Sequence, residues 1–232
     1  MMLNKKNILY FISLCICMYL LAKRSSGMFE YLYAGVEFQD TMIVYGLHFW
    51  SISILGMYIG MECYHYMKSY SSYVMIRNHS RKKVYQNFQM MVIKKVLYFE
   101  LYKIILFSIS IFMIYHKIQI PNILECLQLM ALYIFMEIVL MSILMFIEIF
   151  IHFKIASIFV LSYFIVSLGI GDILVKMKMP TLYHLFLLSD ISMGLRRQFL
   201  ALSSFGTMMF FILILIVVYI IGLRKMMKKD MI

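Results

Sequence analysis

Residues 206–223 read GTMMFFILILIVVYIIGL, eighteen residues without a charged side chain. A helix of about 20 apolar residues crosses the roughly 30 Å hydrocarbon layer of a bilayer. A backbone exposed to lipid must satisfy its own hydrogen bonds, so such a stretch is expected to be helical. Similar stretches precede it at 7–22, 42–61, 96–116, 126–150 and 155–175. The sequence therefore predicts an all-α polytopic membrane protein with six transmembrane helices.

The composition supports this class. Apolar and aromatic residues make up 64% of the 232 residues, and charged residues make up 14%. Soluble domains have about 45–50% apolar and about 25% charged residues. A soluble domain of this length buries only about 70–75% of its unfolded surface, which is too little to hide so many apolar side chains. No linker, repeat or low-complexity tract divides the chain, so we expect a single transmembrane domain over residues 1–232.

The first apolar stretch also has features of a secretory signal peptide. Lys5 and Lys6 precede its apolar core, as in the basic region of a signal peptide. However, no small-x-small cleavage site follows, and Lys23 and Arg24 come directly after the core. We expect a retained membrane anchor, with cleavage as the alternative.

Cationic residues predict the orientation, because Lys and Arg accumulate in cytoplasmic loops. With the N-terminus inside the cell, fourteen of the 22 Lys and Arg residues lie on the cytoplasmic side, seven lie outside and Lys103 lies within a span. The opposite orientation would reverse this two-to-one bias. The prediction is a multi-pass protein of a bacterial inner membrane with both termini in the cytoplasm.

The longest basic segment falls in the predicted cytoplasmic loop, residues 62–95. Three tyrosines at helical spacing precede a cationic turn, and a second apolar stripe follows at Val84, Phe88 and Met91. This pattern predicts two short amphipathic helices joined by a polar turn. The residues expected to form a partner-binding surface are Glu62, Tyr66, Tyr70, Tyr73, Arg77, His79, Ser80, Arg81, Lys82 and Lys83.

The residues of this loop leave two interpretations open. Its cations could lie against anionic lipid headgroups, at about 1 kcal/mol each, or its helices could dock onto a protein. Nucleic acid is not an expected partner, because no base-stacking fold accompanies the charge.

A second long segment, residues 176–205, separates the fifth and sixth apolar stretches. It is half apolar, but its run LYHLFLL is too short to cross a bilayer. Pro180 would interrupt a helix just before that run. We therefore expect a re-entrant or interfacial piece on the outer side.

This order of features resembles the membrane subunits of type-2 ABC transporters, the six-span permeases of bacterial exporters. The resemblance covers the layout of the whole chain and rests on Glu62, on Arg77, Ser80 and Arg81 within MIRNHSRKKVY, and on Lys94 before the third span. In that family the loop between spans two and three carries a coupling helix that docks onto a separate ATPase. Two short re-entrant helices lie between spans five and six. One departure is that only six residues precede the first span, where the family usually has an amphipathic connecting helix.

The resemblance implies a transport subunit and not an enzyme. The sequence contains no Gly-x-x-x-x-Gly-Lys-Ser/Thr phosphate loop, so ATP and Mg²⁺ would be bound by a partner ATPase and no cofactor by this chain. The resemblance further implies a dimer with a second copy or a related permease. The implied substrate is amphipathic, such as an antimicrobial peptide, a lipid or a hydrophobic drug, which would make immunity to antimicrobial peptides one role.

Glu100, Lys103, Glu137 and Glu148 fall inside the predicted spans, where a charged residue costs about 2.5–3.5 kcal/mol to insert. Glu100 and Lys103 are three residues apart and can pair near the cytoplasmic surface. Glu137 and Glu148 lie on nearly the same face of one helix. Either carboxyl could serve a proton relay or a cationic substrate, or form an inter-helix hydrogen bond in its protonated form. Glu148 and His152 offer only two metal ligands, so no metal is expected.

The alternative function is a membrane-embedded peptide-processing enzyme, or a membrane partner protein without transport activity. Cys63 could act as a nucleophile with His65 or His79. The His-Glu-x-x-His pattern of zinc proteases does not occur in the sequence. The four cysteines also lack the spacing of a disulfide framework or a zinc site.

Overall fold

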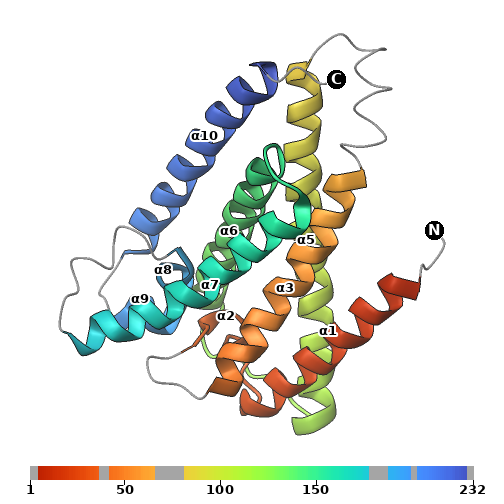
Figure 1. Cartoon of the computed structure of the whole chain (residues 1–232). Coiled ribbons are helices and arrows are strands. Elements are labelled where there is room, and N and C mark those ends of the chain that lie inside the picture. Colours follow the sequence, from red (N-terminus) through yellow and green to blue (C-terminus); the bar gives the residue numbers. More distant parts are fainter. Residues whose placement is uncertain (1–4, 37–41, 66–80, 178–187, 200–202, 229–232) are drawn as a thin grey trace.

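The computed structural model describes residues 5–36, 42–65, 81–177, 188–199 and 203–228, and over these residues the chain is all-helical (Figure 1). The helices are α1 (Lys5–Arg24), α2 (Tyr31–Ala34), α3 (Met42–His65), α5 (Arg81–Tyr115), α6 (Ile123–Glu148), α7 (Phe153–Lys176), α8 (Leu188–Ser192), α9 (Gly194–Phe199) and α10 (Ser204–Lys228).

Five of these helices are long and apolar enough to cross a membrane, namely α3, α5, α6, α7 and α10. The prediction of an all-α, multi-pass membrane protein is confirmed in this form. The first predicted span corresponds to α1, a helix of 20 residues. Many of its large apolar side chains, including Leu9, Phe11 and Ile12, face outward.

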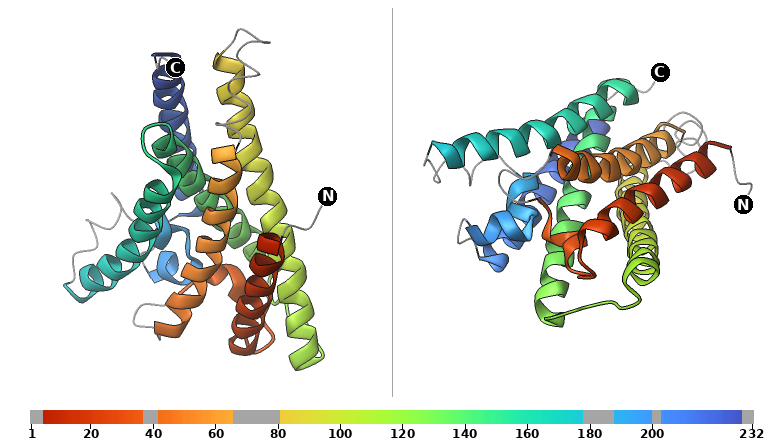
Figure 2. Two further views of the ribbon diagram at one scale, coloured as in Figure 1. Left: turned by 45° about the vertical axis from the view of Figure 1, so that its right-hand side comes forward. Right: turned by 90° about the horizontal axis from the view of Figure 1, so that it is seen from below.

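The long helices lie side by side in one bundle (Figure 1). The first turns of α5 and the last turns of α10 lie at the top of the view, the turn between α6 and α7 lies below them in the upper half, and α2, α8 and α9 lie in the lower half. We call the top the basic end, because its elements carry Lys82, Lys83, Lys154, Arg224 and Lys225. Both α5 and α10 stand above the α6–α7 turn in the turned view as well (Figure 2).

Helix α6 forms the centre of the bundle. It packs against α2, α3, α5, α7, α8 and α10. Its sequence is apolar on all sides, as expected for a helix surrounded by protein. Asn122 caps its first turn by accepting hydrogen bonds from the backbone N–H groups of Leu124 and Glu125, in the usual role of an Asn N-cap.

Helix α5 corrects one expectation about the 62–95 loop. The second half of that loop was expected to be a separate short helix, but α5 begins at Arg81 and continues unbroken to Tyr115. Val84 and Phe88 of the predicted stripe are buried together with Val92, and Met91 is half-buried, where α5 packs against α6 and α10. No Gly or Pro between Arg81 and Tyr115 would stop the helix. Residues 81–95 therefore form one continuous helix with the third span, and not a separate surface helix.

The predicted outer segment 176–205 is described only in part, because Pro180 and most of LYHLFLL lie outside the described residues. Its second half forms the two short helices α8 and α9. Helix α8 packs against α6 and α7, and α9 packs against α2. Ser192 and Met193, where the two helices meet, are buried.

Gly35 lies where the chain after α2 passes α8 and α9, with a φ of +83°. A Cβ at this position would overlap the side chain of Met193. We therefore expect Gly35→Ala to lower the free energy of unfolding by about 1–3 kcal/mol, measured by thermal unfolding in detergent. Gly46→Ala is the matched control, because no heavy atom lies within 4 Å of its added Cβ. Equal stability of the two variants would contradict this packing.

Candidate functional site

A cluster of opposite charges lies in the interior of the bundle. The Nζ atom of Lys103 is 2.5 Å from Oε1 of Glu100 and 3.1 Å from Oε1 of Glu137. Glu100 and Lys103 share one face of α5, as residues three apart do on a helix, and Glu137 reaches them from α6. All three side chains are at most 2% exposed. We call these residues the carboxylate–lysine cluster.

Aromatic side chains from three helices surround the carboxylate–lysine cluster. The hydroxyl of Tyr33 on α2 donates a hydrogen bond to Oε2 of Glu100 at 2.9 Å. The Lys103 ammonium lies 4.7 Å from the ring centre of Tyr133 on α6, within the range of a cation–π interaction. The Tyr133 hydroxyl is 3.4 Å from Nδ1 of His48 on α3. The cluster thus joins α2, α3, α5 and α6 through buried polar contacts.

Glu100 and Lys103 lie far along α5 from its first residue. The sequence placed this pair near the cytoplasmic surface, at the start of a span beginning at residue 96. Because α5 begins at Arg81, Lys103 is about 33 Å along the helix from its first residue, at 1.5 Å per residue. Glu137 is near the middle of the 26-residue α6. The pairing itself is observed, with Glu137 as an additional partner that spacing alone did not reveal.

A second buried cluster surrounds Arg196 of α9. Its Nη2 atom is 3.0 Å from Oδ1 of Asp172 on α7 and donates to the Tyr45 hydroxyl on α3 at 2.6 Å. Its Nε and Nη1 atoms donate to the backbone carbonyls of Val36 and Leu168. The Tyr45 hydroxyl in turn donates to Oδ2 of Asp172 at 2.5 Å. We call this the arginine cluster; it holds α9 against α3 and α7.

Helix α3 connects the two clusters. Tyr45 belongs to the arginine cluster, and His48, one turn further along the helix, contacts Tyr133 beside Lys103. Ser51 lies a further turn along the same face. His48 and Ser51 are each 2% exposed. A stripe of polar groups therefore runs through the bundle interior in an otherwise apolar helix.

Glu62 pairs with Lys95 at the basic end. The Lys95 Nζ atom is 2.9 Å from Oε1 of Glu62 and donates to the Tyr58 hydroxyl at 2.8 Å. The Lys95 and Glu62 side chains are 24% and 42% exposed. This contact links the end of α3 to α5, on either side of residues 66–80. The sequence singled out Glu62 but not its partner.

Glu148 lies away from Glu137, although both were predicted to share one helix face. Neither of its carboxyl oxygens has a hydrogen-bond partner among the described residues. A Cβ added at Gly60 of α3 would lie 3.0 Å from one of these oxygens, so Glu148 faces α3 while Glu137 faces α5. His152 caps α7 by accepting from the Lys154 N–H group. Among the described residues, no group of three His, Cys, Asp or Glu residues could hold a metal ion.

Most of the predicted partner-binding surface lies outside the described residues, including Tyr66, Tyr70, Tyr73, Arg77, His79 and Ser80. Arg81 is the first residue of α5. Lys82 and Lys83 follow it and are exposed at the basic end. Apart from Glu62 on α3, the described part of this surface therefore belongs to the start of a helix that also carries Glu100 and Lys103.

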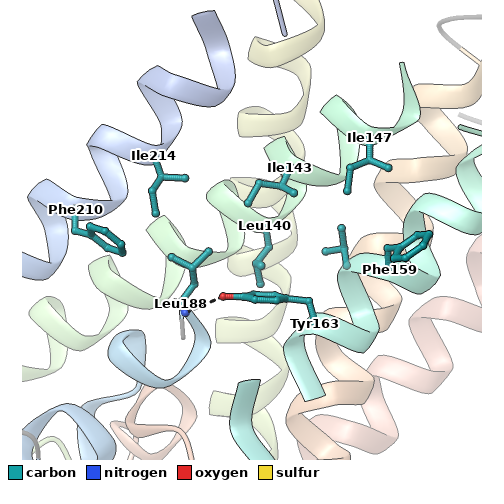
Figure 3. Close-up of a pocket in the computed structure, with 9 residues that line it drawn as sticks. Leu140, Ile143, Ile147, Phe159, Tyr163, Leu188, Phe210 and Ile214 are labelled. Carbon is teal, nitrogen blue, oxygen red and sulfur yellow. Dashed lines mark hydrogen bonds between the residues drawn. The ribbon is translucent and has the colours of Figure 1, made fainter. Parts of the chain in front are cut away.

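An apolar cavity of about 370 Å³ lies between α6, α7, α8 and α10 (Figure 3). Ile143, Phe159 and Ile214 line it from three of these helices, and Leu188 lines it from α8. The Tyr163 hydroxyl also lies at this cavity, but it accepts a hydrogen bond from the Leu188 N–H group at 3.1 Å. The cavity thus presents hydrocarbon to an occupant.

Sequence reasoning did not identify the arginine cluster. Arg196 was counted among outer-side cations, and Asp172 was passed over at the end of a predicted span. Two signals were present: an acid inside an apolar stretch and an arginine inside a half-apolar segment. A buried acid or base usually has a partner. Tyr33 and His48 carried no comparable signal, because their role depends on which helices pack together.

Comparison with known proteins gives a family but no described relative. No curated protein and no solved structure matches the chain. A family model described as a protein of unknown function, DUF2705, matches residues 1–232. Because that match extends over the whole sequence, the chain belongs to the DUF2705 family.

Proposed function

We propose that this chain is the permease subunit of an ATP-driven ABC exporter, with ATP and Mg²⁺ bound by a separate ATPase. The observation that carries the proposal is α5, a single helix of 35 residues that stands above the α6–α7 turn at the basic end (Figure 2). Its first residues, Arg81, Lys82 and Lys83, are cationic. This arrangement offers a rigid, charged projection on which a soluble motor protein can act.

In this proposal α1 is the sixth membrane-spanning helix and the basic end faces the cytoplasm of a bacterial cell. Helices α8 and α9 correspond to the re-entrant pair between spans five and six. Two features support that assignment: both helices are too short to cross a bilayer, and their buried residues pack against α2, α6 and α7. Both termini are then cytoplasmic.

Helix α5 also supplies a mechanical connection from the proposed docking surface to the bundle interior. Lys103 lies on the same unbroken helix as Lys82 and Lys83. It is bound there to Glu100 and to Glu137 of α6. Because a helix without Gly or Pro bends little, a displacement at the basic end would be transmitted to α6. Movement of α5 would thereby rock the bundle and open a route between two permease subunits.

The cavity between α6, α7 and α10 supports the proposal that the substrate is amphipathic. Its lining binds hydrocarbon, and its volume lies in the lower part of the roughly 300–1,000 Å³ range of small-molecule sites. Antimicrobial peptides, lipids and hydrophobic drugs all carry such a portion. The alternative of a peptide-processing enzyme has less support, because the Cys63 side chain is 1% exposed and a nucleophile must contact its substrate.

The docking surface is tested by the double variant Arg81→Glu/Lys83→Glu. The full-length chain would be expressed with the genes that flank its own, and a complex with an ATPase would be recovered in detergent. We expect recovery of the ATPase to fall about tenfold, because two reversed charges replace attraction with repulsion at the contact. Recovery is measured by quantitative immunoblotting of the co-purified ATPase.

Lys117→Glu/Lys176→Glu is the matched control for this experiment. It makes the same change in charge at exposed positions remote from the start of α5. ATPase recovery should stay at the wild-type level. Undiminished recovery with the Arg81/Lys83 variant, or an equal loss with the control, would reject this docking surface.

A further inference from the structure

Unpaired polar atoms gather along one interior strip of the bundle. Among the described residues, Oε2 of Glu137, Nε2 of His48 and Oγ of Ser51 are buried without a hydrogen-bond partner. Buried polar atoms in folded proteins nearly always have a partner, which can be protein, ordered water or an ion. Three such atoms near the carboxylate–lysine cluster therefore call for a ligand that the protein side chains do not supply.

The hydrogen bonds of the cluster distinguish its two carboxyl groups. Both oxygens of Glu100 accept, Oε1 from Lys103 and Oε2 from the Tyr33 hydroxyl, as a carboxylate would. Only Oε1 of Glu137 accepts, at 3.1 Å from Lys103. Its Oε2 atom has no donor and no exposure. Of the four carboxyl oxygens, this is the one without a hydrogen-bond donor among the described residues.

Charge balance also calls for one proton in the cluster. Two carboxylates and one ammonium would leave one uncompensated negative charge in the interior of a membrane-spanning bundle, which is strongly unfavourable. One additional proton makes the cluster neutral. We propose that Glu137 is a proton-binding site, with a dissociable proton on Oε2 that completes the carboxylate–lysine cluster.

The titratable groups around this site come from several elements. Apart from the cluster itself they are Cys17 of α1, Tyr33 of α2, His48 of α3 and Tyr133 of α6. Helices α7 and α10 also pack on α6. Asp172 of α7 is engaged by Arg196 and Tyr45, and α10 carries no charged residue before Arg224. Lys103 is therefore the cation that contacts both carboxyl groups, and its single charge balances one of them.

The polar stripe of α3 provides a route for this proton. Asp172, whose side chain is 21% exposed, accepts a hydrogen bond from Tyr45. His48 lies one turn from Tyr45 and contacts Tyr133, whose ring lies against Lys103. The unpaired atoms of His48 and Ser51 mark where water molecules would complete the connection.

On release, the O–H bond of Glu137 breaks and the proton passes to water. Glu137 remains as a carboxylate beside Lys103, and the cluster then carries one net negative charge. Proton binding therefore favours the packed arrangement of α5 against α6, and release favours an arrangement in which water reaches the cluster. This coupling extends beyond the proposed export function, because it requires neither an ATPase nor a transported substrate.

Infrared spectroscopy of the full-length protein in detergent micelles tests the proposal, because a protonated carboxyl group has its own C=O stretching absorption. At neutral pH we expect Glu137→Gln to remove the absorption of one carboxyl group per chain. Glu100→Gln should remove the same absorption, because a single remaining carboxylate balances Lys103 without a proton. Glu148→Gln is the control and should retain this component, although the unpaired Glu148 oxygens can contribute a separate one.

Each outcome bears on the proposal. Absence of any protonated carboxyl absorption in the wild type would overturn it directly, without any variant. Retention of the full absorption in a folded Glu137→Gln protein, verified by size-exclusion chromatography, would also overturn it. If Glu137→Gln does not fold, the Glu100→Gln spectrum decides. Loss of the absorption of one protonated carboxyl group supports the proposal that Glu100 and Glu137 share one charge balance with Lys103, and an unchanged spectrum rejects it.

Discussion

Lys103→Met should leave little stably folded protein. The variant keeps most of the side-chain volume but removes the cation that contacts Glu100 and Glu137, both at most 2% exposed. Removing one partner of a buried ion pair typically costs about 3–5 kcal/mol, because the remaining charge has no compensation. We expect a lowered midpoint of thermal unfolding and increased aggregation. Both are measured by size-exclusion chromatography of heated samples in detergent.

Two further variants separate charge from packing in this prediction. Lys95→Met removes a similar side chain from the partly exposed pair with Glu62 and should cost about 1 kcal/mol or less. The triple variant Glu100→Gln/Lys103→Met/Glu137→Gln removes all three charges and should recover much of the lost stability. If Lys103→Met is as stable as Lys95→Met, electrostatic balance does not hold this part of the bundle together.

Arg196→Met is expected to have the second-largest effect. The Arg196 side chain is fully buried and donates to two backbone carbonyls, to Tyr45 and to Asp172. Methionine fills a similar space but donates no hydrogen bond, so these acceptors would lose their donor. We expect a loss of about 3–5 kcal/mol in the free energy of unfolding. Because these contacts join α9 to α3 and α7, local release of α9 should precede global unfolding.

Limited proteolysis in detergent would detect that release as faster cleavage near α9 than in the wild type. Lys176→Met provides the control, since Lys176 is exposed at the end of α7 and should change stability by no more than about 0.5 kcal/mol. Asp172→Asn should have an intermediate effect, because the amide keeps one acceptor for Arg196. A stable Arg196→Met variant with an unchanged cleavage pattern would show that the arginine cluster does not anchor α9.

Both predictions concern residues that the proposed function also uses. In the permease proposal, α5 transmits motion from its cationic start to the carboxylate–lysine cluster. The arginine cluster fixes α9 while α5 and α6 move. A variant that preserves folding but breaks one of these contacts, such as Glu137→Gln, is therefore also suited to transport measurements that test the permease proposal.

The helical fold and the membrane environment of the chain follow from local features of its sequence. Long apolar stretches such as 206–223 require lipid as their solvent, and lipid requires each backbone segment to satisfy its own hydrogen bonds. These constraints are local, so they can be read without knowing which helix packs against which. The pairing of Glu100 with Lys103 was predictable for the same reason, because residues three apart share a helix face.

The arrangement of the interior charges, in contrast, depends on how the helices pack. Glu137 and Glu148 lie on one helix, yet Glu137 meets Lys103 and Glu148 faces α3. The spacing of Asp172 and Arg196 in the sequence did not predict their ion pair, because the two residues belong to different helices separated by an intervening segment. The boundary of α5 also depended on packing: the stripe at Val84, Phe88 and Val92 continues the third span because α6 and α10 cover it. Contacts between distant segments depend on the packing of whole helices, which the periodicity of a single segment does not encode.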